Sequence, residues 1–276
     1  MYKKNFFFNV LNRIINVLNR INPLYFVYEK MRRRVIRIKH NGQYFLFSAP
    51  SSLCKYRVDT FSTKEPDTLH WIDNFNEGEV FFDIGANVGL YSVYAAKTRN
   101  CRVFSFEPSV FNLEVIARNI FLNELTNKIQ ILPIALNNSN SVGLLNMSST
   151  NTGGALSTFN QTYGYDGSEL KVIFKLPTLS MRMDSVIEFL KIPFPKYIKI
   201  DVDGIEHLIL QGGESVLKNA DQILIEVSRD FIEQKKSLFE ILEKNGFRKK
   251  MYTENELKIY GINEGDPAHN QIWVKR

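Results

Sequence analysis

The stretch VFFDIGANVGLYS, residues 80–92, decides the fold of this chain. It begins with a short apolar run rich in β-forming residues, which is typical of a parallel strand covered on both faces. Gly85 and Gly89 follow in a tight turn, where the lack of a side chain allows the backbone to approach a ligand. A helical pattern resumes at Leu90, so the free N–H groups of the helix N-terminus are expected to face the turn. The stretch therefore predicts a strand, a turn and a helix around a ligand site.

The spacing within the turn narrows the class of ligand. A dinucleotide site requires G-x-G-x-x-G to hold a pyrophosphate, whereas here Asn87 replaces the middle glycine and Asp83 stands before the turn. A carboxylate at a strand end suits a ligand with an ammonium group, and S-adenosylmethionine carries an ammonium and a sulfonium cation. The next predicted strand, residues 102–106, ends at Glu107, where an acid can accept both hydroxyls of a ribose. For either acid alone, an ordinary α/β turn with a capping acid is the alternative.

Four motifs, in this order, resemble those of the FkbM-type S-adenosylmethionine-dependent methyltransferases. They are KEPDT at 64–68, DIGANVG at 83–89, FEP at 106–108 and KIDVDGIE at 199–206. The resemblance covers about residues 57–230, and it departs from the family at Asp203, where a Glu is usual. It implies an α/β fold, a Rossmann-like class I methyltransferase sheet that is mostly parallel with a C-terminal antiparallel strand. It also implies S-adenosylmethionine as the cofactor.

The resemblance further implies which residues hold the cofactor. Glu65 is expected to bind the amino-acid end of the cofactor, although the first-turn acid of a helix that starts near Pro66 would have the same residue type. Asp201 is expected to face the same crevice as Asp83 and Glu107, because ligands bind at the carboxyl ends of the strands in a doubly wound sheet. The expected cofactor residues are Glu65, Asp83, Gly85, Asn87, Gly89, Glu107, Pro108, Ala135 and Asp201.

The predicted strand at residues 197–201 ends in a cluster of acids, and we expect this cluster to act on the acceptor. Asp201 and Asp203 are expected to orient or deprotonate a hydroxyl, while Lys199 stabilises the negative charge that develops on it. Lys199 has two other interpretations, a charge-balancing residue or a base with a depressed pKa. His207 is interpreted as a helix-surface residue rather than a general base. No metal is expected, since three carboxylates without a supporting Asn are weak evidence for Mg²⁺.

These residues predict O-methylation of a small polar acceptor, and the resemblance points to a sugar hydroxyl of a surface polysaccharide or a natural-product precursor. Two alternatives stay open. A nicotinamide-dependent oxidoreductase would share the fold, but G-x-G-x-x-G and a Tyr-x-x-x-Lys pair near the site are missing. A membrane-associated scaffold with a degenerate cofactor pocket would not need the acids and glycines of the two turns.

Residues 1–49 are expected to form an extension to a methyltransferase domain of residues 50–276. Residues 5–28 place apolar side chains at three- and four-residue steps, as in an amphipathic helix. Two alternating segments then flank Asn41-Gly42, which predicts a β-hairpin. No stretch approaches the ~20 apolar residues of a membrane span, and no signal peptide is recognisable. The predicted location is therefore cytoplasmic.

The positive charge of the chain is concentrated at its N-terminus. Residues 1–39 hold ten Lys and Arg against one Glu, a net charge of +9, so the remainder carries −3 of the total of +6. The catalytic region is thus mildly acidic, which argues against a nucleic-acid channel there. Residues 1–34 are expected to pack on the domain or on a second subunit; the alternative is a peripheral contact with an anionic inner membrane. Cys54 and Cys101 lack the spacing of a zinc site or a disulfide framework.

Three further expectations concern the second half of the chain. Residues 146–170 are rich in Ser, Thr, Asn, Gly and Tyr and predict a lid or acceptor-binding loop, or else a variable mobile loop. Residues 129–136 predict the third strand, and residues 259–262 and 272–274 predict closing antiparallel strands. Asp184 is expected to cap the helix that begins there.

Overall fold

A computed structural model describes residues 29–30, 34–260 and 268–275 of the chain. The helix expected at residues 5–28 lies outside the described residues. Among the residues described, none of the helices combines the length and the apolar composition needed to cross a bilayer.

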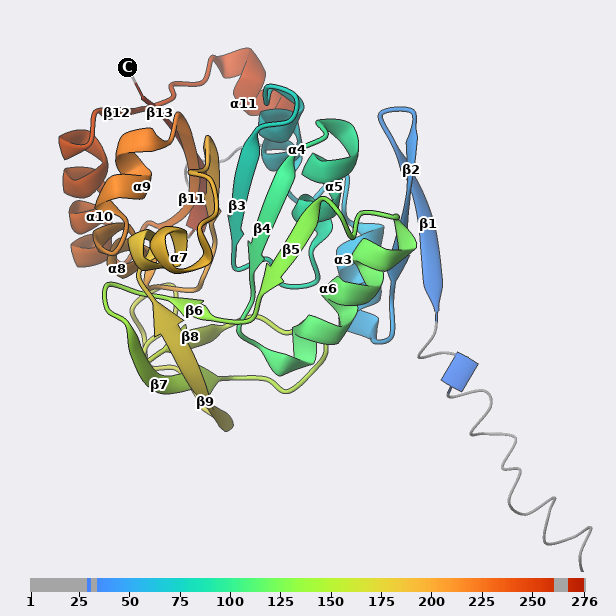
Figure 1. Cartoon of the computed structure of the whole chain (residues 1–276), viewed down its shortest axis with the longest axis horizontal. Helices are drawn as coiled ribbons and strands as arrows, with labels where there is room; N and C mark the ends of the chain where they lie inside the picture. Colours follow the sequence, from blue (N-terminus) through green and yellow to red (C-terminus); the bar gives the residue numbers. More distant parts are fainter. Residues whose placement is uncertain (1–28, 31–33, 261–267, 276) are drawn as a thin grey trace, which may run out of the picture.

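A twisted seven-stranded sheet forms the centre of the molecule, in the order β12-β13-β11-β10-β3-β4-β5 (Figure 1). Its strands are β3 (Val80–Ile84), β4 (Arg102–Phe106), β5 (Ile129–Leu132), β10 (Tyr197–Ile200), β11 (Gln222–Ser228), β12 (Phe247–Lys249) and β13 (Ala268–Lys275). β13 pairs antiparallel with β11 and β12, and the pairings from β11 through β5 are parallel. The predicted α/β fold, mostly parallel with a C-terminal antiparallel strand, is confirmed.

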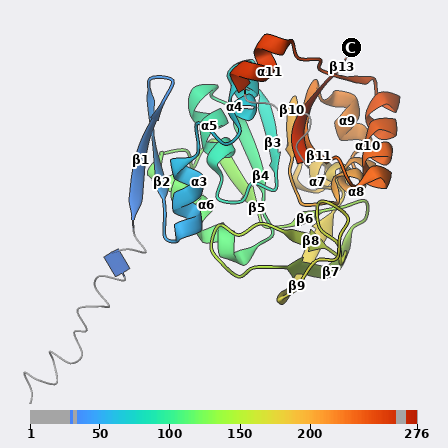
Figure 2. The same ribbon diagram turned by 180° about the vertical axis from the view of Figure 1, so that it is seen from behind.

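Helices cover both faces of this sheet (Figures 1 and 2). One face carries α4 (Pro66–Asp73), α5 (Leu90–Thr98) and α6 (Val110–Leu122); the other carries α7 (Met183–Leu190), α8 (Glu206–Gln211), α9 (Glu214–Asn219) and α10 (Ile232–Lys244). Successive strand residues point to opposite faces, so Phe81 joins the core beside α4 and α5 while Phe82 joins the core beside α7 to α10. Burial on both faces explains the continuous apolar run of β3.

The predicted hairpin is β1 (Val35–His40) and β2 (Gln43–Ser48), paired antiparallel around Asn41-Gly42. Asn41 and Gly42 both have positive φ, as a two-residue hairpin turn requires. The hairpin packs on the main body, because Phe45 and Phe47 are fully buried in the core beside α5. The division at residue 49 stays a prediction. Helix α3 (Ser52–Asp59) follows the hairpin and lies near β1.

A second, four-stranded sheet stands at the carboxyl end of the central strands, in the order β6-β9-β7-β8. It consists of β6 (Ala135–Leu136), β7 (Ser141–Met147), β8 (Ser157–Phe159) and β9 (Phe174–Met181). The single strand expected at residues 129–136 is therefore wrong. The chain leaves the central sheet after Leu132, at Pro133, which has no N–H to donate to a strand ladder.

Two other expectations are corrected. A closing strand at residues 259–262 is wrong for residues 259 and 260, which belong to helix α11 (Glu254–Tyr260), while residues 261 and 262 lie outside the described residues. The partners of β13 are β11 and β12. Asp184 does not cap its own helix, whose N-cap residue is Arg182. Its carboxylate instead accepts hydrogen bonds from the backbone N–H groups of Ser215 and Val216 at 3.1 and 3.0 Å, at the start of α9.

Candidate functional site

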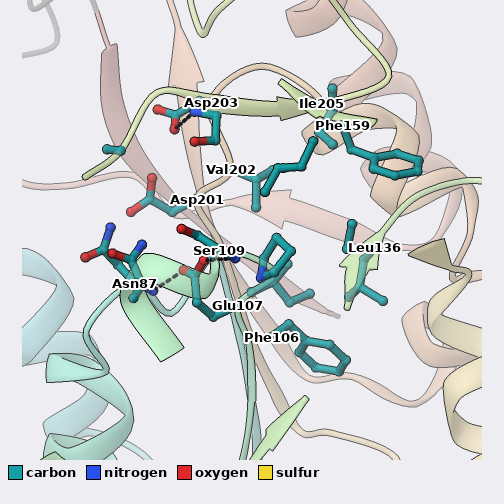
Figure 3. Close-up of a pocket in the computed structure, with 18 of the residues that line it drawn as sticks. Asn87, Phe106, Glu107, Ser109, Leu136, Phe159, Asp201, Val202, Asp203 and Ile205 are labelled. Carbon is teal, nitrogen blue, oxygen red and sulfur yellow. Dashed lines mark hydrogen bonds between the residues drawn. The ribbon is translucent and has the colours of Figure 1, made fainter. Parts of the chain in front are cut away.

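The candidate site is a pocket at the carboxyl ends of β3, β4 and β10, next to the small sheet (Figure 3). One side of the pocket is apolar and is lined by Phe106, Ile134, Ala135, Leu136, Leu145, Phe159, Ile205 and Ile209. The polar lining comes from Arg57, Lys64, Asn87, Glu107, Ser109, Asn112, Asp201, Asp203 and Glu226. This position, beyond the strand ends of an open α/β sheet, is where such folds bind ligands.

The turn after β3 is held in its conformation by its neighbours in the protein. Gly85 has φ +81 and Gly89 has φ +77. A Cβ at Gly85 would lie 1.9 Å from the backbone oxygen of Asp201, and one at Gly89 would lie 2.6 Å from Cγ1 of Ile116. These glycines therefore make room for the end of β10 and for α6. Gly85 also lines the pocket, and contact of the turn with a ligand stays a prediction.

Glu107 is the acid that the structure places most clearly in the pocket. Its Oε2 accepts a hydrogen bond from the backbone N–H of Asn87 at 2.8 Å, and its Oε1 accepts one from the N–H of Ser109 at 2.7 Å. These bonds fix the carboxylate, and each oxygen keeps a further acceptor position. Burial raises the pKa of Glu107 to about 7, although the two N–H groups act in the opposite direction. Pro108 lines the same pocket.

Asp83 lies beneath the pocket and is not among its lining residues. Its carboxylate is fully buried and accepts a hydrogen bond from the hydroxyl of Ser92. Burial raises the pKa of Asp83, and the nearby charge of Lys199 opposes that rise. Asp83 is the β3 residue that pairs with Lys199 of β10, so its carboxylate balances the Lys199 charge. Its contact with a ligand ammonium stays a prediction.

A smaller cavity adjoins the pocket and shares Arg57, Lys64, Gly85, Asn87 and Asp201 with it. Its lining also includes Glu65, Lys199 and the first two residues of α5, Leu90 and Tyr91. Helix α4 begins at Pro66 with Glu65 as its N-cap residue, but the Glu65 side chain makes no capping bond. The Glu65 carboxylate instead lies 2.8 Å from Nζ of Lys64. Burial would raise the pKa of Glu65, but Lys199 and Lys64 outweigh it and lower this pKa to about 2.

Lys199 is a buried ammonium group surrounded by carboxylates. Its Nζ lies 2.6 Å from Oδ2 of Asp201. Burial alone would lower the pKa of Lys199, but the charges of Asp201, Glu65 and Asp83 outweigh burial and raise it. Lys199 therefore keeps its proton, and of its three interpretations the geometry leaves charge balance and anion stabilisation but not the base.

The other two acids of the cluster are engaged with the backbone. Oδ2 of Asp203 accepts hydrogen bonds from the N–H groups of Leu156 and Ser157, at 2.7 and 3.3 Å. Glu206 accepts one from the N–H of Gly204 at 3.1 Å and another from the amide of Gln234. Asp203 still lines the pocket, whereas Glu206 is enclosed in the protein.

Glu226 is a pocket residue that the sequence reasoning missed. Ile200 of β10 pairs in parallel with Ile225 of β11, so Asp201 and Glu226 are the next residues of neighbouring strands. Both line the pocket. Burial, followed by the charges of Asp201 and Asp203, raises the pKa of Glu226 to about 9. Its position at a strand end was the signal that could have identified it.

The lining fits S-adenosylmethionine in its chemistry. The apolar side suits a flat adenine ring, and Ala135 lies on that side as expected. Glu107 suits the two ribose hydroxyls, while Asp201 and Glu65 are acids near the turn that suit the cationic end. Among the residues described, no group of three or more His, Cys, Asp or Glu is arranged to hold a metal ion.

The sequence of the chain is similar to known methyltransferases. The family model described as "Methyltransferase FkbM domain" matches residues 83–249, more than half of the chain. "Hexuronic acid methyltransferase AglP" of Haloferax volcanii is 24% identical over 158 residues, 56% of this chain and 59% of that protein. "Methyltransferase sdnD" of Sordaria araneosa is 33% identical over 82 residues, 29% of this chain and 32% of that protein. The chain thus matches about a third to three fifths of these relatives' lengths.

Solved structures with a similar fold include a methyltransferase FkbM from Methylobacillus flagellatus, which is 14% identical with a TM-score of 0.48. That match covers 90% of this chain and 57% of the other. M. jannaschii TYW2 in complex with AdoMet is also 14% identical, with a TM-score of 0.45, and the match covers 87% of this chain and 84% of the other.

Proposed function

The chain belongs to the FkbM methyltransferase family, and we propose that it transfers the methyl group of S-adenosylmethionine to a hydroxyl of a small polar acceptor. The acceptor in this proposal is a sugar of a surface polysaccharide or glycoconjugate. Family membership favours this reaction over the nicotinamide-dependent alternative. The observation that carries the proposal is the Glu107 carboxylate, held by two backbone N–H groups and facing a pocket with one apolar side.

The cofactor residues divide the site into two parts. Glu107 accepts hydrogen bonds from the ribose, and the side that includes Phe106 and Ala135 packs against the adenine. Asp201 and Glu65 balance the positive charges of the methionine end, in the adjoining cavity that holds the first turn of α5. Bound S-adenosylmethionine supplies a methyl group made electrophilic by its sulfonium.

Asp201 is the residue that we assign to the acceptor. It lines both cavities, and Nζ of Lys199 holds its carboxylate in place at 2.6 Å. A fixed carboxylate can orient a hydroxyl and take its proton as the oxygen becomes methylated. Lys199 limits the build-up of negative charge beside it. Asp203 is less suited to this task than we expected, since one of its oxygens already accepts two backbone N–H groups.

The support for a sugar acceptor is chemical. Asp201, Asn112, Ser109 and Glu226 give the pocket several hydroxyl-binding side chains around a small volume. The relative from Haloferax volcanii is named for a hexuronic acid, a polyhydroxylated sugar with a carboxylate. A uronic acid offers two kinds of oxygen to a methyl donor, so a hydroxyl ether and a carboxyl ester must be distinguished.

A transfer assay with methyl-labelled S-adenosylmethionine tests the proposal. Purified full-length protein is incubated with a panel of neutral sugars, uronic acids and their glycosides. We expect label in a sugar product that resists mild alkali, because a methyl ether is stable where a methyl ester releases methanol. Asp201→Asn should lower turnover by about 10²-fold or more, and it should lower turnover by much more than it weakens cofactor binding, because Glu65 still faces the cationic end of the cofactor. Alkali-labile label would refute the hydroxyl acceptor, and unchanged turnover in the variant would refute the role of Asp201.

A further inference from the structure

The loop between β7 and β8, residues 148–156, crosses the cofactor pocket. Gly154 and Ala155 of this loop line the pocket together with Glu107 and Asp201, which lie on the strand ends opposite. We call residues 148–156 the strap. It begins and ends in the small sheet, where Met147 pairs with Ser157, and its middle reaches α3 and α6 on the far side of the pocket.

The far side of the strap is held by side chains that bind its backbone. Oδ1 of Asn112 accepts a hydrogen bond from the N–H of Gly153 at 2.9 Å, and Nε of Arg57 donates one to the oxygen of Gly153 at 2.8 Å. Asn87, in the cofactor turn, donates to the oxygen of Gly154 at 2.7 Å. Gly153 has φ +82, and a Cβ there would lie 2.8 Å from Sγ of Cys54. Only glycine fits at this contact.

The near side of the strap is held by the carboxylate of Asp203, in addition to the backbone hydrogen bond from Ser148 to Leu156 at 3.2 Å. Oδ2 of Asp203 accepts the N–H groups of Leu156 and Ser157, and Figure 3 shows Asp203 at the edge of the pocket. Asp203 and Leu156 both have left-handed backbone conformations, with φ of +59 and +58. Such conformations are unfavourable for residues other than glycine and persist only where their surroundings hold them. Loss of the carboxylate would therefore release a strained contact as well as two hydrogen bonds.

We propose that Asp203 is a positioning residue that holds the strap closed over the cofactor, so that opening of the strap governs cofactor entry and release. That the bound molecule is S-adenosylmethionine rests on the proposed function, whereas the closure of the strap by Asp203 does not depend on it. Contacts at both ends use the strap's backbone groups, so closure depends on the residues around the pocket rather than on the strap's own side chains. Asn87 contributes to two parts of the site at once, since its N–H binds Glu107 while its side chain binds the strap.

Hydrogen exchange in the ligand-free, full-length protein tests the closure. Asp203→Gly keeps a residue that adopts φ +59 without strain but removes the carboxylate, and we expect the amides of Leu156 and Ser157 to exchange at least tenfold faster. Asp203→Asn retains an acceptor oxygen without the charge, so exchange should be intermediate. Gly153→Ala should release the other side of the strap. Asp166→Ala is the matched control, because Asp166 accepts a hydrogen bond from the N–H of Ser168 in the loop between β8 and β9 and does not line the pocket.

Release of S-adenosylmethionine, measured by surface plasmon resonance, tests the consequence. The dissociation rate should rise at least tenfold in Asp203→Gly and Gly153→Ala, rise less in Asp203→Asn, and stay unchanged in Asp166→Ala. If the amides of Leu156 and Ser157 exchanged at the same rate in Asp203→Gly and wild type, the claim that Asp203 holds the strap closed would be overturned. If these amides exchanged faster but S-adenosylmethionine dissociated at the same rate, the claim that the strap controls cofactor release would be overturned. Failure of wild type to bind S-adenosylmethionine would count against the proposed function, while the exchange data would still decide whether Asp203 holds the strap.

Discussion

Replacing Lys199 with Met removes a buried positive charge that interacts with three carboxylates at the site, those of Asp201, Glu65 and Asp83. Met has a similar length and is apolar and flexible, so the change creates little empty space. Asp201 and Asp83 would lose the cation that Lys199 provides, while Glu65 would keep its ion pair with Lys64. Removing one partner of a buried ion pair costs about 3–5 kcal/mol, because the other charge stays buried and uncompensated.

The structure places the expected loss near the lower end of that range. The Asp201 side chain is 32% exposed, so water can recover part of its solvation, whereas Lys199 is only 2% exposed. We therefore expect the free energy of unfolding to fall by about 3 kcal/mol. With a urea m-value of about 3 kcal/mol/M, the unfolding midpoint should fall by about 1 M at pH 7.

The pH dependence of this loss has a definite sign. In the wild type, burial would raise the pKa of Glu65, but the positive charges of Lys199 and Lys64 outweigh burial and lower this pKa to about 2. A depressed carboxylate pKa contributes stability above the unfolded pKa, and this contribution disappears as the pH falls towards the folded pKa. The variant lacks most of that contribution, so the difference between Lys199→Met and wild type should shrink as the pH is lowered from 7 towards 3.

The exposed pair Lys196–Asp221 provides a matched control, since its atoms are 3.2 Å apart and both side chains are more than 40% exposed. Lys196→Met should cost at most about 1 kcal/mol. Urea unfolding followed by circular dichroism measures both variants. If Lys199→Met lost no more stability than Lys196→Met, the picture of a buried charge cluster that organises the site would be wrong.

Two further predictions concern the turn and the ribose acid. Gly85→Ala places a Cβ 1.9 Å from the backbone oxygen of Asp201 at φ +81, so it should lower the free energy of unfolding by about 3 kcal/mol or more. The control Gly78→Ala has a similar φ of +79 but no atom within 4 Å, so it should cost only about 1–2 kcal/mol. Equal melting temperatures of the two variants would contradict the packing argument. The pKa of Glu107 is raised to about 7 from 4.5, so the folded state binds more protons between these values and wild-type stability falls with rising pH in that window. Glu107→Gln lacks this titration, so its stability relative to wild type should rise by up to about 3 kcal/mol from pH 4.5 to 8. Thermal denaturation measures this, and a stability difference between the variant and wild type that does not vary with pH would show that Glu107 is not buried as described.

Local sequence patterns predicted the parts of the fold that depend on local chemistry. The apolar run of β3, the Asn-Gly hairpin turn and the strand-end acid Glu107 were all readable, since each is determined by neighbouring residues. The three-residue strand β12 was not, because a strand that short has no periodicity of its own and is specified by pairing with β13.

The site was less predictable where distant segments meet. The neighbour that requires Gly85 is the backbone of Asp201, which the sequence places in another motif. Asp83 and Glu107 both end or follow central strands, yet only Glu107 lines the pocket, because Asp83 accepts a bond from Ser92 and faces Lys199. Glu226 lies at the site because of the register between β10 and β11. The strap lies there because the loop between β7 and β8 runs past Asp203. Neither arrangement follows from a local sequence motif.

Calorimetric titration of the purified protein with S-adenosylmethionine, with NAD as the control ligand, tests the central claim most directly. Any cofactor that co-purifies is first removed and checked by mass spectrometry. The account predicts micromolar binding of S-adenosylmethionine, no binding of NAD, and at least a tenfold loss of affinity in Glu107→Ala. A folded, ligand-free protein that does not bind S-adenosylmethionine, or a Glu107→Ala variant that binds it as wild type does, would contradict the account.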